Sequence, residues 1–184
     1  DLCAAPGTKT THLAELMNGK GSIVATDVDL GRLRRIEENA DRLGFSSMIE
    51  PLVIREDLSE LPEGPFNAIL IDVPCSNTGV MRRRVDVRWR LHARELSVLA
   101  RTQLDLLQRA ARLLPVDGTL VYSTCSLEHE ENEAVVEKFV QKRRDFEQEI
   151  TRTITPMNDG VDGAFVACLR RVEVDTTSPE PTAC

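Results

Sequence analysis

The sequence has no long hydrophobic run and few histidines and cysteines. In its 184 residues, no apolar stretch approaches the roughly 18 residues that a membrane-spanning helix needs, and no signal peptide opens the chain. The five cysteines show no C-x-x-C spacing of the kind that indicates zinc or a redox motif. The three histidines, His12, His92 and His129, share no ligand spacing. These absences favour a cytoplasmic protein with reduced thiols and no metal.

Positive charge is also in short supply. The net charge of −7 at pH 7 argues against a protein that coats nucleic acid by bulk attraction, although a local basic patch remains compatible with it. With 41% hydrophobic and 29% charged residues and no internal repeat, the chain has the composition of one folded α/β domain. We expect that domain to span residues 1–174, followed by a disordered tail over residues 175–184 that is rich in Thr, Ser, Pro and Glu.

Short strand-like runs alternate with longer helical stretches along the chain. The expected strands are residues 22–26, 50–54, 67–72, 118–123 and 164–169. The expected helices are residues 9–18, 30–43, 94–114 and 128–143. This alternation predicts right-handed βαβ units and a mainly parallel sheet. The residues Asp1 to Cys3 look like the end of a further strand whose beginning is missing, so we expect a fragment of a longer protein.

Two cysteines follow strand-like runs at their carboxyl ends. Cys75 follows the strand-like run that ends in Asp72. Cys125 ends a second strand-like run, which begins at Gly118. In an open α/β sheet, ligands bind at the carboxyl ends of the strands, so this pair suggests covalent chemistry more than packing. A single cysteine is more often a small buried hydrophobe. We apply that interpretation to Cys168, and we expect Cys3 to pack or to line a loop.

The first ten residues, DLCAAPGTKT, combine a strand end, a tight turn of small residues and a helix start. Gly7 can take a positive φ angle at little cost, and the helix start offers unpaired N–H groups to a ligand. Neither the phosphate-binding G-x-x-x-x-G-K-[ST] pattern nor the dinucleotide G-x-G-x-x-G pattern is present. As a generic signal the loop is therefore weak, and a purely structural turn is the alternative.

Two acids strengthen the case for a ligand at this edge. Asp27 closes the second strand, where an acid in nucleotide-binding α/β folds accepts hydrogen bonds from ribose hydroxyls. Asp57 follows the third strand, and either receives an adenine amino group or is a solvated loop acid.

Four segments in order carry a resemblance to a known family. DLCAAPGTKT, ATDVD, IDVPCSNTGVMRR and STCSLEHEENEAVV resemble the motifs of the Sun-type (Fmu-type) RNA cytosine-C5 methyltransferases, and DGAFVACLRR resembles the family's closing strand. The resemblance implies a class I, Rossmann-like methyltransferase fold. It implies a mainly parallel central sheet with an antiparallel strand near the C-terminus and helices on both faces. Residues 1–174 would then be the catalytic domain, with an N-terminal RNA-binding region absent from this chain.

The resemblance also implies S-adenosylmethionine as cofactor and ribosomal or transfer RNA as substrate. Cys125 would be the nucleophile, and Cys75 the second cysteine needed for product release. Asp72 would lie beside the sulfonium and the target base, Asp27 at the ribose and Asp57 near the adenine. The methionine and sugar would be surrounded by Cys3, Ala4, Ala5, Pro6, Gly7, Thr8 and Lys9. The chain departs from the family's usual residues at Thr8, Asn77 and Val85.

Cytosine chemistry explains why these residue types are needed. Addition of a thiolate to C6 turns C5 into a carbon that can attack a sulfonium methyl group, and a thiolate later leaves readily. Asp72, if protonated or sharing a proton, can hydrogen-bond N3. Cys75, or a base or water beside it, is then expected to help remove the C5 proton. The target base must be unstacked to reach both thiols, so a loop or a flipped base is the expected substrate.

One dense basic cluster follows the Cys75 loop. It includes Arg82, and also Arg88 and Arg90, which flank Trp89. We expect Arg82 to contact RNA and Trp89 to pack in the core, with a solvated turn as the alternative for the cluster. The stretch from Glu128 to Asn132 resembles the first turn of a helix. Two other functions stay open: a methyltransferase-like module that only binds RNA or cofactor, and a methyltransferase acting on a protein or small molecule. The oligomeric state is open, and a monomer is favoured.

Overall fold

The computed structural model describes residues 1–55 and 60–174. Asp57 and the expected tail over residues 175–184 lie outside these ranges. The strands are β1 (Ile23–Asp27), β2 (Ile49–Val53), β3 (Ala68–Asp72), β4 (Thr119–Thr124), β5 (Phe146–Ile154) and β6 (Ala164–Arg171). The α-helices are α1 (Thr8–Leu16), α2 (Leu30–Leu43), α3 (Val87–Arg90), α4 (Ala93–Ala110), α5 (Glu133–Lys142) and α6 (Pro156–Asp159). Three short 3₁₀ turns are η1 (Thr78–Val80), η2 (Ala111–Leu113) and η3 (His129–Glu131).

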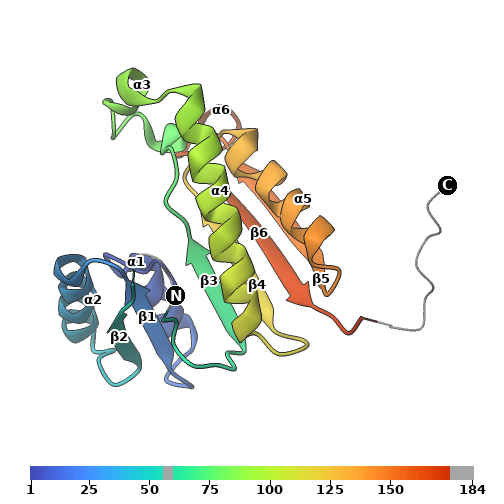
Figure 1. The fold of residues 1–184 in the computed structure, drawn as a ribbon. Helices are drawn as coiled ribbons and strands as arrows, with labels where there is room; N and C mark the ends of the chain where they lie inside the picture. The colour runs from blue at the N-terminus through green and yellow to red at the C-terminus, as the bar shows by residue number, and fades with distance from the viewer. Residues whose placement is uncertain (56–59, 175–184) are drawn as a thin grey trace.

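The strands form one layer that is joined through the first residues of the chain. β1 pairs in parallel with β2, and β3 pairs in parallel with β4. β6 pairs antiparallel with both β4 and β5. The Thr26 N–H donates to the Asp1 carbonyl at 2.8 Å, and the Leu2 N–H donates to the Leu70 carbonyl at 2.9 Å, so residues 1–4 lie between β1 and β3. The order is therefore β2, β1, residues 1–4, β3, β4, β6 and β5 (Figure 1).

Helices cover both faces of this layer. Alternate side chains of a strand point to opposite faces, and two separate apolar clusters follow from that alternation. Ile23 and Ala25 of β1 pack with residues of α1 and α2. Leu2 and Ile71 pack instead with α4 and α5, which lie across β3, β4 and β6 in Figure 1. The expected mainly parallel sheet with an antiparallel strand near the C-terminus is confirmed.

The local boundaries follow from ordinary capping chemistry. The helix expected over residues 30–43 begins after Asp29, whose side chain accepts the Arg32 N–H at 3.0 Å, and ends at Gly44 with φ of 78°. The helix expected over residues 128–143 is divided, since η3 precedes α5. Strand β5 was not expected at all. Among the described residues, no helix is both long enough and apolar enough to cross a membrane.

Candidate functional site

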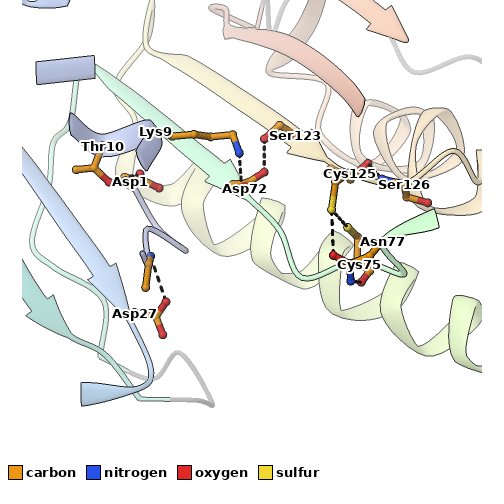
Figure 2. A network of polar contacts seen from close by, with 12 residues as sticks. Asp1, Lys9, Thr10, Asp27, Asp72, Cys75, Asn77, Ser123, Cys125 and Ser126 are labelled. Atoms are coloured by element: carbon orange, nitrogen blue, oxygen red, sulfur yellow. Dashed lines mark hydrogen bonds and ion pairs between the residues drawn. The ribbon is translucent and has the colours of Figure 1, made fainter. Parts of the chain in front are cut away.

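The two strand-end cysteines lie against each other. Because β3 and β4 are parallel and Asp72 is in register with Ser123, the loops that follow them leave the same edge of the sheet. The Cys75 and Cys125 sulfur atoms are 3.2 Å apart, and both side chains are partly exposed. Figure 2 shows the two thiols facing each other across the gap between these loops. The sequence prediction that the two cysteines share one edge is therefore correct.

The contact makes the two thiols chemically unequal. The hydrogen bond with Cys75 lowers the pKa of Cys125, and the positive charge of Lys9 lowers it further, while burial and the charge of Asp72 act in the opposite direction. The same hydrogen bond, together with burial, raises the pKa of Cys75. A thiolate is the nucleophilic form of cysteine. The opposite directions of the two pKa shifts favour Cys125 as the thiolate of the pair.

Asn77 links the same two loops. Its side-chain N–H donates to the Cys75 carbonyl at 2.8 Å, and its Oδ1 lies 3.2 Å from the Cys125 sulfur. This contact exists while Cys125 is protonated and its thiol donates to the amide oxygen, and ionisation of Cys125 would remove it. The backbone of Asn77 has φ of 64°, a left-handed conformation that Asn tolerates better than most residues. Asn77 thus fits this backbone conformation and adds a contact to each cysteine.

A lysine and an aspartate connect the first loop to the cysteine site. Lys9, at the start of α1, donates to Asp72 Oδ2 at 2.6 Å. The Ser123 hydroxyl donates to the other oxygen of Asp72 at 2.7 Å (Figure 2). The side chains of Lys9 and Asp72 are 52% and 34% exposed, so this ion pair is open to a ligand and to solvent. The ion pair with Asp72 thus holds the positive charge of Lys9 near Cys125.

The loop over residues 3–9 has the shape of a ligand cradle. Ala4 and Ala5 are buried, whereas Pro6, Thr8 and Lys9 are exposed. Gly7 has φ of 96°, and a Cβ atom there would lie 3.2 Å from the Cα of Ile36. No side chain caps the start of α1, so its first N–H groups are available to a ligand. Burial raises the pKa of Cys3 to about 12, which makes this thiol a lining residue and not a nucleophile.

Asp27 lies at the carboxyl end of β1 and is almost fully buried, with 4% of its surface exposed. Its carboxylate accepts the Ala5 N–H at 3.3 Å and the Asp29 N–H at 3.1 Å, and Arg32 lies 3.4 Å away. Two carboxylate oxygens offer about four acceptor sites, so capacity for ribose hydroxyls remains. Asp57, expected near the adenine, lies outside the described residues.

The sequence reasoning missed Glu131, which holds the two cysteine loops together. The sequence analysis placed it only in the first turn of a helix, yet it is completely buried. Its carboxylate accepts the Ser76 N–H and the Gln103 amide, both at 2.9 Å, and the Ser126 hydroxyl at 2.6 Å. Ser76 follows Cys75 and Ser126 follows Cys125. One carboxylate therefore fixes the backbone next to both thiols, and no local sequence signal distinguishes it from its acidic neighbours.

Replacing Glu131 with alanine is expected to destabilise the fold. The Ser76 N–H and the Gln103 amide would lose a buried partner, and each unsatisfied group costs about 1–3 kcal/mol. We expect the free energy of unfolding, measured by urea titration, to fall by about 3 kcal/mol. Glu130→Ala is the control, because Glu130 is exposed and such changes stay within about 0.5 kcal/mol. Equal unfolding midpoints for the two variants would contradict this role.

In the basic cluster, the prediction for Trp89 was wrong. Trp89 was expected to pack in the core, but it is 80% exposed, because the short helix α3 projects from the domain (Figure 1). Arg82, expected to contact RNA, forms an ion pair with Asp162, which also binds Arg83 at 2.7 Å. Within residues 1–55 and 60–174, no group of three His, Cys, Asp or Glu side chains is arranged to hold a metal ion.

The strand order, the small-residue cradle at the first strand and the acid at the end of β1 define a class I, Rossmann-like methyltransferase fold. Residues 1–170 match the model of the family described as 16S rRNA methyltransferase RsmB/F, and the chain belongs to this family. The Sun-type resemblance is thereby confirmed.

Individual relatives agree with this assignment. The chain is 35% identical to the probable ribosomal RNA small subunit methyltransferase B of Bacillus subtilis (strain 168), over 93% of this chain and 42% of that protein. It is 40% identical to the ribosomal RNA small subunit methyltransferase B of Escherichia coli (strain K12), over 87% of this chain and 37% of that protein. The crystal structure of NSun6 from Pyrococcus horikoshii with SFG superposes with a TM-score of 0.83 at 33% identity, over 95% of this chain and 47% of that one. The chain thus spans about two fifths of the length of its curated relatives.

Proposed function

We propose that this domain transfers a methyl group from S-adenosylmethionine to C5 of a cytosine in 16S ribosomal RNA. Membership of the RsmB/F family supports the reaction class and the RNA. The observation that carries the cysteine mechanism is the 3.2 Å contact between two thiols whose pKa values are displaced in opposite directions. A module that only bound RNA or cofactor would need neither thiol.

In the proposed reaction, the Cys125 thiolate forms a bond to C6 of the cytosine. Electron density then moves to C5 and N3, and the ion pair of Lys9 with Asp72 would lie close to the developing charge. When bound, S-adenosylmethionine would supply an electrophilic methyl group for transfer to C5. The base must be unstacked from its neighbours to reach this site, so an unpaired or flipped cytosine is the substrate.

Cys75 acts after methyl transfer. Its pKa is raised chiefly by the hydrogen bond to Cys125 and also by the Cys125 charge. Both causes disappear when Cys125 becomes a neutral thioether in the adduct, so Cys75 becomes more acidic and gives its proton to solvent. The resulting thiolate accepts the C5 proton, and Cys125 leaves C6 as a thiolate that again receives a hydrogen bond from Cys75. Two reduced thiols are required throughout, which suits the cytoplasm.

The residues fit the proposed cofactor. The uncapped start of α1 leaves backbone N–H groups available for contacts along the loop of Cys3, Ala4, Ala5, Pro6, Gly7, Thr8 and Lys9. Asp27 would hold the ribose, Asp72 would lie beside the sulfonium, and Asp57 keeps its proposed place near the adenine. Residues 1–174 would form the catalytic domain of a monomer. Arg82 is the proposed RNA contact on its surface, and a separate region would supply further RNA affinity.

The test is incubation of protein expressed from the complete gene with labelled S-adenosylmethionine and 16S ribosomal RNA from cells lacking that gene. We expect label at C5 of one or a few cytosines, located by mass spectrometry of nuclease fragments. Label on another atom, on protein or on a small molecule would overturn the proposal. Tight cofactor binding without any transfer would support the binding-module alternative instead.

A further inference from the structure

A cleft of about 470 Å³ opens directly beside Cys75. Most of its lining residues belong to the α3 segment and the first turns of α4. In Figure 1 these two elements lie at the end of the domain remote from β1 and β2. The lining of the cleft includes Cys75, Arg90, Arg94 and one acid, Glu95, together with several apolar side chains. Pockets that bind small ligands occupy about 300–1,000 Å³, so the cleft is large enough for one nucleotide. Because Cys75 lines it, its occupant lies next to the proposed target base.

The charge around this cleft is opposite to that of the whole chain. Residues 82–95 contain six arginines and only two acids, Asp86 and Glu95, in a chain of net charge −7. Arg90 lies 3.6 Å from Asp86. Arg94 is exposed, and among the described residues no carboxylate lies within ion-pair distance of it. A local excess of arginine on an acidic protein attracts a polyanion to this one place.

The apolar side of the cleft suits a base. Leu91, Val98 and Leu99 give it an apolar wall next to the two arginines. Trp89 is the only tryptophan of the chain and is 80% exposed on α3, between Arg88 and Arg90. An exposed indole beside arginines provides a surface on which an unpaired base can stack. The arginines here suit the phosphates of a single strand, and the apolar wall and the indole suit its bases.

We propose that this cleft binds the nucleotide next to the target cytosine in single-stranded RNA. Arg90 and Arg94 contact its phosphate, the apolar wall receives its sugar or base, and Trp89 stacks on the following base. This inference rests on the proposed function, because it places the RNA strand at the Cys75 side of the same site. It would fix the direction in which the substrate crosses the edge of the sheet.

The test compares three variants of the protein expressed from the complete gene. Arg94→Ala removes a phosphate contact, and Val98→Trp fills the cleft from a half-exposed position. Arg101→Ala is the matched control, since Arg101 is an exposed arginine on the same helix and does not line the cleft. Binding to unmodified 16S ribosomal RNA is measured over a range of salt concentrations, alongside methyl transfer and the thermal midpoint.

We expect Arg94→Ala to weaken RNA binding about fivefold and to reduce the salt dependence by about one ion, as loss of one phosphate contact predicts. Val98→Trp should raise the KM for RNA several-fold and leave the KM for S-adenosylmethionine unchanged. Arg101→Ala should resemble the wild type. If both cleft variants bind RNA normally, or change only the thermal midpoint or the oligomeric state, the cleft does not bind RNA and the inference is overturned.

The two proposals fail separately in this design. A wild-type protein that binds RNA but transfers no methyl group would contradict the proposed function, while a weaker complex with Arg94→Ala would still support the cleft. Normal methyl transfer with unchanged RNA binding by both cleft variants would contradict the cleft alone.

Discussion

Replacing Cys125 with alanine is expected to reduce methyl transfer by about 10⁴-fold or more, the usual effect of removing a covalent nucleophile. The structure gives the reason, since Cys125 is the thiol whose pKa is lowered, by the hydrogen bond with Cys75 first and by Lys9 as well. Alanine cannot add to C6, so C5 stays a poor nucleophile. Transfer of labelled methyl groups to 16S ribosomal RNA under single-turnover conditions measures the effect.

Cys168→Ala is the matched control for this prediction. Cys168 is a free cysteine on β6, in register with Val121 of β4, and its polar neighbour is Glu149. It makes no contact with the loops that carry the candidate site, so its loss should leave transfer within about twofold of the wild type. A Cys125→Ala variant that kept a tenth of the activity would show that the reaction proceeds without a covalent bond to this residue.

Replacing Cys75 with alanine is expected to shift the pH dependence of adduct formation to higher pH. Cys75 provides the largest of the influences that lower the pKa of Cys125, and alanine provides no hydrogen bond. The pKa of Cys125 therefore rises in the variant. Below that pKa, each unit of increase costs about tenfold in thiolate and in the rate of attack. The measurement is the rate of covalent complex formation with 16S ribosomal RNA between pH 6 and 10.

Cys75→Ser tests the effect of the hydrogen bond separately from the effect of the sulfur atom. A serine hydroxyl can still donate to the Cys125 thiolate, so its profile should lie closer to that of the wild type than the alanine profile does. A Cys75→Ala profile that coincided with the wild type, or moved to lower pH, would contradict the proposed influence of Cys75 on its neighbour.

The position of the two cysteines could be predicted because it depends on strong local signals. Buried strand-like runs precede Cys75 and Cys125, and helices separate them, so the rules for parallel sheets bring both to one edge. Helix α2 begins and ends where expected, since Asp29 and Gly44 are good caps. These features depend on residues that are adjacent in sequence or on the regular order of strands.

Features that depend on distant or exposed residues could not be predicted in this way. Only Phe146 of β5 is buried, and the following residues are exposed up to Thr153, so the strand carries no apolar alternation. Glu131 becomes a buried acceptor only when donors from α4 and from both cysteine loops converge on it. Trp89 was expected in the core from its residue type alone, whereas the short helix α3 leaves it exposed.

The central claim is that the two thiols have different tasks, with attack by Cys125 and release assisted by Cys75. The most direct test is to incubate the Cys75→Ala and Cys125→Ala variants with 16S ribosomal RNA and S-adenosylmethionine, and to measure covalent protein–RNA complexes by denaturing electrophoresis and mass spectrometry. Since formation is slower without Cys75, the incubation is run at alkaline pH. The account predicts that Cys75→Ala accumulates a complex linked through Cys125 and that Cys125→Ala forms none. A complex in Cys125→Ala that is linked through Cys75, with none in Cys75→Ala, would contradict it.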